Sequence, residues 1–261
     1  MAMERTTASK IYVGCAGWSL PKTRQAEFPS DGSHLERYAG RFNAVEINST
    51  FYRPHQSKTY ARWAASVPDT FRFSIKIPKA ITHTARLKTS VDVVRKFVDE
   101  VAGLGGRLGC WLVQLPPSLQ FDPAVAAEFF ELFLDEAAGS GGSLVCEPRH
   151  TSWFAPAADS LLEQYGIARV AADPAVVPAA AQSGGAREPV YIRLHGSPRM
   201  YYSAYSQSQI QQSAAWLEQC RVEAREVWCI FDNTADGAAI DNGLQLLREL
   251  MLRRAGCVTD V

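Results

Sequence analysis

Eight short apolar runs, most of them followed by a segment with helical spacing, limit the folds open to this chain. The runs cover residues 11–16, 44–48, 71–76, 110–115, 143–147, 167–172, 190–195 and 226–231, and the helical segments cover 34–39, 57–66, 90–104, 122–138, 156–165, 207–223 and 241–254. Alternating strands and helices at this spacing predict parallel strands joined by right-handed crossovers. Eight such units in 261 residues predict an α/β fold, a single (β/α)8 TIM-type barrel over residues 11–254 with irregular loops.

An open doubly wound sheet is the alternative fold. It would carry helices on both faces and favour strands that are apolar on both sides. Several strands here are polar on one side: Glu46 and Asn48 share a side opposite Val45 and Ile47, because strand side chains alternate. This pattern favours a barrel with a polar lumen.

Two stretches stand outside the alternation. Residues 1–10 are expected to be disordered or extended, and the first nine lack the apolar core of a signal peptide. Residues 175–188 are rich in alanine, proline and glycine and predict no helix. Both a mobile lid and an ordinary loop remain open for that segment.

Composition limits the classes of partner that the chain is expected to bind. Lys plus Arg and Asp plus Glu both number 27, so the chain lacks the overall basic charge typical of a dedicated nucleic-acid binder. No apolar run approaches the roughly 20 residues that a membrane-spanning helix needs. The six cysteines form no C-x-x-C and no zinc-like spacing, and reduced, structural thiols suit the cytoplasm. The glycines at 103, 105, 106 and 109 follow a helix and precede a strand, which indicates a helix end rather than a nucleotide-binding loop.

Polar residues gather on the predicted lumen side, near the carboxyl ends of the strands. This set comprises Glu46, Asn48, Ser74, Lys76, Gln114, Glu147, Arg149, Asp173, Arg193, His195 and either Asp232 or Asn233. Barrel enzymes carry their active sites at this end. The pattern therefore predicts a site for a small molecule or a phosphate group.

The residue types suggest roles. Glu46, Lys76, Glu147 and His195 are predicted to be catalytic, through acid–base chemistry. Lys76, Arg149 and Arg193 would bind an anion, since arginine's fork suits phosphate or carboxylate. Glu46, Glu147, Asp173 and His195 could instead hold Mg²⁺, Mn²⁺ or Zn²⁺, although no His-rich motif sharpens that alternative.

Structural interpretations compete with these roles. Glu46 and Lys76 could form a buried ion pair that only fills the barrel. Arg149 or Arg193 could neutralise Glu147, and His195 could simply be hydrogen-bonded to a neighbouring strand. Aromatic residues in the loops at the mouth could stack on a sugar or a base, or simply cover the rim: Trp18, Phe51, Tyr52, Trp153, Tyr201, Tyr202 and Tyr205.

Several motifs resemble one family. They are Gly14-x-x-Gly-Trp-Ser19, Val45-Glu-Ile-Asn-Ser-Thr-Phe-Tyr-Arg53, Phe71–Lys76, Ile81-Thr-His83, Leu112–Pro117, Glu147-Pro-Arg-His150, Tyr191–Gly196 and Phe231-Asp-Asn233. Over about residues 11–253 the chain resembles the YecE-like family, a domain of unknown function found mainly in bacteria. The resemblance implies a TIM-type barrel and no established reaction. A loose likeness of this family to apurinic endonucleases and sugar isomerases has prompted nucleic-acid and hydrolase suggestions.

The matching motifs complete the predicted site. Trp18, Asn48, Tyr52, His83 and Asn233 join Gln114, Arg149, Asp173 and Arg193 as predicted substrate-binding residues. Two departures stand out. The family pattern usually has Glu-x-Arg at the fifth strand, and in Glu147-Pro-Arg149 the middle residue is an unusual proline. Asp232 stands where the family pattern more often has asparagine. An inward-facing Asp232 would add a carboxylate and favour a metal.

Three functions follow from these patterns. The first is an enzyme, of hydrolase or of isomerase or lyase type, that acts by acid–base chemistry on a small phosphorylated or carboxylated substrate. The second is a metal-dependent phosphoesterase or nuclease-like hydrolase, with nucleic acid the less supported partner. The third is a non-catalytic binding scaffold. Substrate, metal and oligomeric state stay open.

Overall fold

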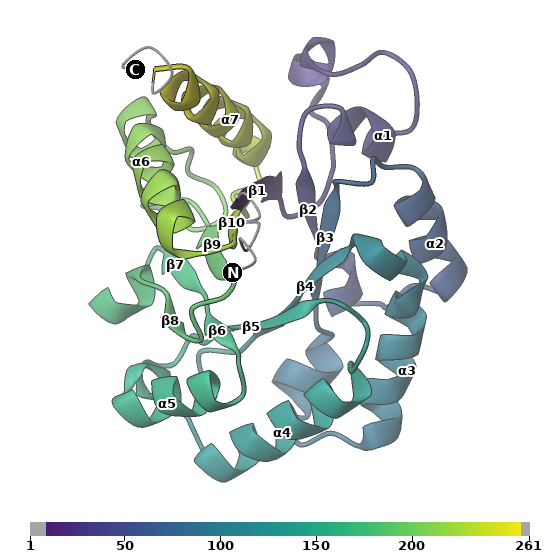
Figure 1. Ribbon diagram of the computed structural model, residues 1–261, viewed down its shortest axis with the longest axis vertical. Coiled ribbons are helices and arrows are strands. Elements are labelled where there is room, and N and C mark those ends of the chain that lie inside the picture. The colour runs from purple at the N-terminus through teal and green to yellow at the C-terminus, as the bar shows by residue number, and fades with distance from the viewer. Residues whose placement is uncertain (1–8, 257–261) are drawn as a thin grey trace, which may run out of the picture.

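The computed structural model describes residues 9–256 and shows a barrel of parallel strands surrounded by helices (Figure 1). The strands are β1 Lys10–Cys15, β2 Ala44–Ile47, β3 Arg72–Lys76, β4 Leu108–Gln114, β5 Ser143–Glu147, β6 Ala168–Arg169, β7 Ala171–Asp173, β9 Val190–Leu194 and β10 Glu226–Phe231. The α-helices are α1 His34–Ala39, α2 Ser57–Ala65, α3 Val91–Val101, α4 Pro123–Glu136, α5 Pro156–Gln164, α6 Gln207–Glu223 and α7 Ala238–Gly256. The order matches the predicted (β/α)8 barrel.

The strands form two ladders that together close the barrel. One ladder has the order β1-β10-β9-β7 and the other β2-β3-β4-β5-β6-β8, where β8 is the short strand Gly184–Gly185. The predicted sixth strand joins them, because its first half, β6, pairs with β5 and its second half, β7, pairs with β9. Val170 lies between the halves, and its N–H donates to the Cys146 carbonyl at 2.8 Å. The sixth strand thus changes partner midway.

Local sequence signals position the helices. Ser33 and Ser206 each form a capping box at the start of α1 and α6. The Asp122 side chain accepts from two backbone N–H groups at the start of α4. Gly103 lets the turn after α3 approach α2, because a Cβ there would lie 2.2 Å from the Ser57 carbonyl oxygen. The glycine cluster therefore serves helix packing at this point.

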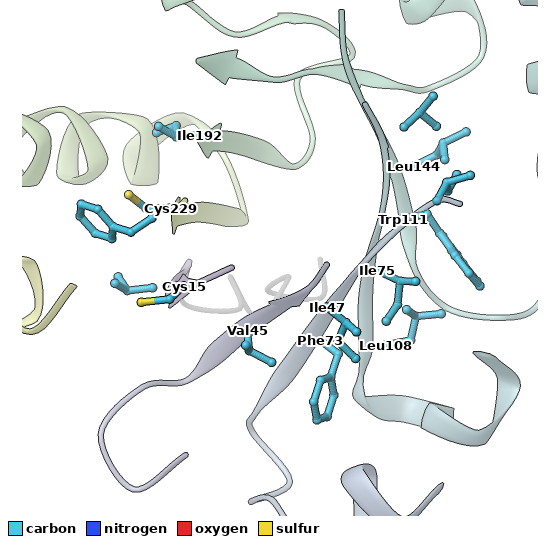
Figure 2. Packing of buried hydrophobic residues seen from close by; sticks show 14 of the residues in the cluster. Cys15, Val45, Ile47, Phe73, Ile75, Leu108, Trp111, Leu144, Ile192 and Cys229 are labelled. Carbon is cyan, nitrogen blue, oxygen red and sulfur yellow. The ribbon is translucent and has the colours of Figure 1, made fainter. Parts of the chain in front are cut away.

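Alternating strand residues build two apolar layers. The larger layer packs between strands and helices and includes Cys15, Val45, Ile47, Phe73, Ile75, Trp111, Leu144, Ile192 and Cys229 (Figure 2). The smaller cluster comprises Tyr12, Ala44, Cys110, Leu112, Val145, Ala168, Val170, Tyr191, Trp228 and Ile230. Its members alternate with those of the first layer, so they fill the lumen. Their strands continue into polar residues, so the charged groups lie above an apolar floor.

The prediction for the N-terminal segment needs adjustment. Lys10 belongs to β1, so the extended segment predicted for residues 1–10 includes the first residue of a paired strand; residues 1–8 lie outside the described part of the chain.

No helix among residues 9–256 is long and apolar enough to cross a membrane.

The segment 175–188 is tied to the barrel wall. It contains the short 3-10 helix Pro178–Ala181 and strand β8, Gly184–Gly185, which pairs antiparallel with β6. The guanidinium of Arg169 donates to the carbonyls of Ala179 and Gln182 and pairs with Asp159 at 2.7 Å. These contacts favour an ordinary, anchored loop.

Side chains join β1 to β2, where backbone pairing is reduced to one bridge between Ala16 and Glu46. The Asn43 side chain accepts from the Val13 N–H and donates to the Ile11 carbonyl, both at 2.8 Å. The Tyr38 hydroxyl accepts from the Cys15 N–H at 2.8 Å and donates to the Ala44 carbonyl at 3.0 Å. Two side chains thus replace ladder hydrogen bonds along this seam.

Tyr38→Phe tests the seam. The substitution leaves a buried N–H and a buried carbonyl without their partner, so the free energy of unfolding should fall by about 1–3 kcal/mol. Urea unfolding measures it. Tyr165→Phe is the control, since the Tyr165 hydroxyl makes no hydrogen bond within residues 9–256, and it should change stability little. Equal stability of the two variants would contradict the seam's role.

A candidate active site at the carboxyl ends of the strands

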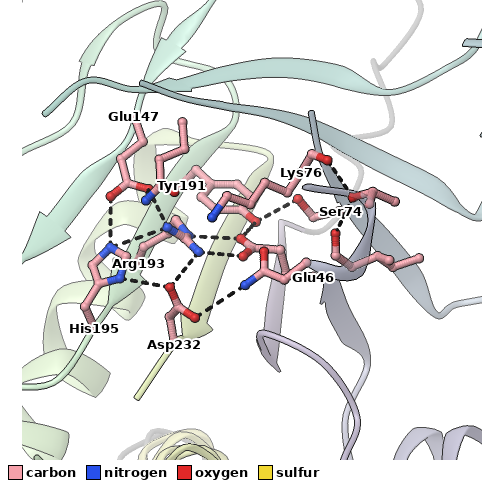
Figure 3. A network of polar contacts seen from close by, with 12 residues as sticks. Glu46, Ser74, Lys76, Glu147, Tyr191, Arg193, His195 and Asp232 are labelled. Atoms are coloured by element: carbon pink, nitrogen blue, oxygen red, sulfur yellow. Dashed lines mark hydrogen bonds and ion pairs between the residues drawn. The ribbon is translucent and has the colours of Figure 1, made fainter. Parts of the chain in front are cut away.

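Arg193 of β9 is the centre of a buried charged network (Figure 3). Its side chain is fully buried and binds Glu46 of β2 in a two-pronged contact, Nη2 to Oε1 at 2.6 Å and Nε to Oε2 at 3.0 Å. Nη1 also donates to Glu147 at 2.5 Å, and Nη2 to Asp232 at 2.9 Å. One guanidinium therefore joins carboxylates from three different strand ends.

His195 and Arg149 extend the network on one side. The Nδ1 atom of His195 lies 3.0 Å from Asp232 Oδ2, and its Nε2 atom lies 2.9 Å from Glu147 Oε1. Arg149 Nη2 lies 2.5 Å from the same Glu147 oxygen. Nδ1 therefore faces a carboxylate, whereas Nε2 faces both the Glu147 carboxylate and the Arg149 guanidinium, whose Nη2 lies 2.6 Å away.

Hydroxyl and amide groups complete the carboxylate shells. The Tyr191 hydroxyl lies 3.0 Å from Glu46 Oε2 and 2.7 Å from the Ser74 hydroxyl. The Gln114 amide donates to Glu147 Oε2 at 3.2 Å, and the Asn48 amide lies 3.4 Å from Asp232 Oδ1. Buried carboxylates require such partners, because an unpaired buried charge is strongly unfavourable.

The network holds the carboxylates of Glu147 and Asp232 ionised. Burial raises the pKa of Glu147, but the guanidiniums of Arg193 and Arg149 outweigh burial and bring that pKa well below its usual range. Burial also raises the pKa of Asp232, and Arg193 and His195 reverse the effect and lower it. Burial lowers the pKa of Arg193, yet the three carboxylates raise it well above normal. Arg193 is therefore a fixed cation.

A pocket of about 450 Å³ opens beside this network. It is lined by Asn48, Phe51, Tyr52, Lys76, Lys79, His83, Gln114, Tyr201 and Asp232. Asp232 is the one lining carboxylate, and it is already bound to Arg193 and His195. The groups left facing the pocket are mainly cationic and aromatic, and they suit an anion.

Lys76 is the most unusual lining residue. Its side chain is buried, with 8% exposed, and it makes no ion pair within residues 9–256. Its amino group lies 4.4 Å from the centroid of the Phe51 ring. Burial, and then the charge of Arg193, lower its pKa. Figure 3 draws no contact from that amino group.

His83 reaches the same pocket from the π-helix Ala80–Thr84, which follows β3. Its Nδ1 atom lies 2.9 Å from the Thr82 hydroxyl. Burial and the neighbouring charges of Lys76 and Lys79 lower its pKa, so His83 is a neutral imidazole near pH 7. It is half-buried and open to a ligand, unlike the fully buried His195.

Most of the predicted site residues come together, but on two levels. Glu46, Glu147, Arg149, Arg193 and His195 form the network, and Asn48, Tyr52, Lys76, His83 and Gln114 line the pocket. Glu46 pairs with Arg193, so the buried Glu46–Lys76 pair considered from the sequence is not formed.

Three predicted residues lie away from the pocket. Trp18 packs edge-on against Trp63 at 5.0 Å between ring centroids. The Asp173 carboxylate accepts from the Tyr205 hydroxyl at 2.6 Å. Asn233 donates to Asn242 of α7 at 2.9 Å, so Asp232, and not Asn233, faces the network. The substrate-binding roles predicted for these three stay without structural support.

The four predicted metal ligands do not converge. Glu46 and Glu147 are bound by arginines, and Asp173 is engaged by Tyr205. Within residues 9–256, no group of three or more histidine, cysteine, aspartate and glutamate side chains is arranged to hold a metal ion. The inward Asp232 contacts Arg193 instead of completing such a group.

Sequence reasoning missed Lys79 and Tyr191. Tyr191 shares lumen parity with Arg193 and His195, so the same alternation could have found it. Lys79 follows Ile77-Pro78 in a loop, where no periodic signal exists. A larger groove of about 740 Å³, between the loops after β3 and β4, is lined by Trp153 and by none of the residues predicted to be catalytic or substrate-binding.

Fold and site together define a class: a (β/α)8 barrel with ionisable groups and a pocket at the carboxyl ends of its strands, where barrel enzymes act. A family model described as "Protein of unknown function DUF72" matches residues 12–260, and the chain belongs to that family. The predicted YecE-like resemblance is thereby confirmed.

Similar proteins agree with this assignment. The chain is 35% identical over 175 residues to the UPF0759 protein YecE of Escherichia coli strain K12, an alignment covering 65% of this chain and 61% of YecE. The chain therefore matches less than two thirds of the length of that relative. A crystal structure of a DUF72 family protein from Enterococcus faecalis has a TM-score of 0.77 at 19% identity, covering 93% of this chain and 96% of that one.

A more distant neighbour is D-psicose 3-epimerase in the presence of D-fructose. Its TM-score is 0.55 at 13% identity, and the match covers 93% of this chain and 98% of that one. At such identities the likeness shows the fold alone, and it confirms the TIM-type barrel.

Glu147→Gln tests the network through pH. The variant leaves guanidiniums uncompensated and should lose about 3–5 kcal/mol of stability at pH 7. A lowered folded-state pKa gives stability that is present above the unfolded value, ordinarily 4.5 for glutamate, and is lost as pH falls toward the folded pKa. The difference in the free energy of unfolding between the parent protein and the variant should therefore become smaller below pH 4.5. Urea unfolding across pH measures it.

Glu131→Gln is the matched control, because Glu131 is exposed and makes no ion pair in the described chain. It should behave like the parent protein at every pH. A gap for Glu147→Gln that stays constant from pH 7 to pH 3 would contradict the buried, ionised state of Glu147.

Proposed function

We propose that the protein is an enzyme that binds a small phosphorylated or carboxylated compound in the pocket beside Lys76 and acts on it by proton transfer. The observation that carries the proposal is the amino group of Lys76, which makes no ion pair within residues 9–256 and opens to a pocket shared with Lys79 and His83. Most of the Lys76 side chain is buried, so its amino group is partly desolvated, and an anionic ligand beside it would relieve that cost.

The lining groups suit different parts of a ligand. Lys79 is exposed at the mouth and suits an anionic group as a point charge. Asn48 Oδ1 is buried without a hydrogen-bond partner among residues 9–256, and a ligand hydroxyl could supply one. Tyr52, with 82% of its surface exposed, and Tyr201 offer rings at the rim.

Proton transfer has two routes. His83, neutral near pH 7, can accept a proton directly from a bound molecule. Asp232 lines the pocket and contacts His195, which in turn contacts Glu147. The predicted catalytic residues Glu147 and His195 would then act from behind Asp232, by positioning that carboxylate rather than in contact with substrate.

The other functions are less supported. A metal-dependent phosphoesterase or nuclease needs a donor set, and the candidate ligands are bound by arginines instead. A non-catalytic scaffold agrees with the fully paired network, but it leaves the unpaired Lys76 unexplained. The likeness to D-psicose 3-epimerase concerns the fold, so it does not select a sugar substrate.

Thermal shift tests the proposal. Phosphorylated and carboxylated metabolites, screened singly in the presence of a chelator, should raise the melting temperature, since a ligand at 100 times its Kd adds about 2.7 kcal/mol. Lys79→Met should weaken the binding of an active compound roughly tenfold or more, because it removes a charge-assisted contact.

Lys10→Met is the control. Lys10 is an exposed lysine at the opposite, amino end of β1, and its variant should keep the full shift. An anion response that survives Lys79→Met unchanged, or a screen in which only divalent metals stabilise the protein, would overturn the proposal.

A further inference from the structure

We propose that Lys76 is a covalent catalyst whose amino group forms an imine with a carbonyl carbon of the substrate. The substrate would then be an aldehyde or ketone that also carries a phosphate or carboxylate group. This inference rests on the proposed function, because it assigns a chemical role to the same pocket.

The arrangement of the carboxylates leaves Lys76 free. A buried lysine ordinarily pairs with a carboxylate, and Glu46 faces the lumen on the neighbouring strand, two residues out of register with Lys76. Both Glu46 oxygens are instead occupied, one by Arg193 Nη2 and the other by Arg193 Nε and the Tyr191 hydroxyl. Glu147 is likewise bound by Arg193 and Arg149.

The surroundings of the amine increase the share of its neutral, nucleophilic form. Lysine becomes a nucleophile when it is desolvated or when it lies near another cation. Lys76 meets both conditions, because it is buried beside the Phe51 ring and burial and the Arg193 guanidinium lower its pKa. It also opens to the pocket, so a ligand can reach it.

The bond changes balance without an oxidant or reductant. The amine nitrogen adds to the carbonyl carbon, and the π electrons move to the oxygen, which takes up a proton. The C–O bond then breaks, and the oxygen leaves as water with the two hydrogens that the amine supplied. His83 and Asp232 line the same pocket and can carry these protons. Protonation of the imine nitrogen makes the neighbouring C–H acidic, which prepares the proposed proton transfer.

Borohydride trapping tests the inference on the full chain. Pyruvate supplies a carboxylated ketone, dihydroxyacetone phosphate a phosphorylated one, and hydroxyacetone an uncharged control. Reduction of an imine should add the mass of the probe minus one oxygen atom, and peptide mapping should place the adduct on Lys76. At least one anionic probe should label Lys76 faster than hydroxyacetone does.

Variants separate the amine from its charge. Lys76→Arg keeps a positive charge but offers no amine for imine formation, so labelling should be lost while the anion-induced thermal shift is retained at least in part. Lys76→Met provides a second variant that removes the buried charge. Lys10→Met should label like the parent protein.

The outcomes distinguish the two proposals. Anions that raise the melting temperature without an adduct at Lys76 would overturn the covalent role and leave the proposed function standing. No shift and no adduct would overturn both. An adduct on Lys79, or one spread equally over surface lysines with all three probes, would also overturn the assignment to Lys76.

Discussion

The contact between Arg193 and Glu46 is the interaction on which the site depends. A fully buried guanidinium must have its N–H groups paired, and these donors reach Glu46, Glu147 and Asp232. Because the partners stand at the ends of β2, β5 and β10, one side chain fixes the relative positions of strands around the barrel. Such a buried ion cluster is weak evidence for stability by itself, since desolvation offsets much of the attraction. Its consequence here is positional: it sets which charges reach the pocket.

That constraint accounts for the two levels of the site. The carboxylates of Glu46 and Glu147 are held by arginine, and neither pairs with Lys76 in the described chain. The lysine therefore faces the pocket, where burial and then the charge of Arg193 lower its pKa. The fixed charges thereby stay in the buried network, and Lys76 and the other lining groups face the pocket. Asp232 is the residue common to both levels, because it lines the pocket and contacts His195. A proton that moved between the pocket and the buried network would pass through the Asp232 carboxylate.

Strand alternation predicted the fold and much of the site, because parity decides which face a side chain occupies. It placed Glu46, Lys76 and Arg193 in the lumen, as the structure does. Strand alternation gives the face on which a side chain lies, but not its partner across the barrel. It therefore could not predict that Glu46 pairs with Arg193 instead of Lys76. It also failed where the strand was not regular: the change of partner at Val170 precedes Asp173, which meets Tyr205 and not the network. Loop residues such as Lys79 have no period to follow.

The site also contributes to closing the barrel. Strands β1 and β2 share one backbone bridge, at Ala16 and Glu46, and side chains supply the other links between them. Glu46 is therefore both the last paired residue of the seam and the first carboxylate of the network. Arg193 reaches it from β9, and Asp232 at the end of β10 lies near Asn48, so two side-chain contacts pass β1 and link its neighbours on one side to β2. Barrel closure and the geometry of the pocket then depend on the same side chains. This coupling gives a physical reason for a costly buried ion cluster in a barrel whose first two strands are poorly paired.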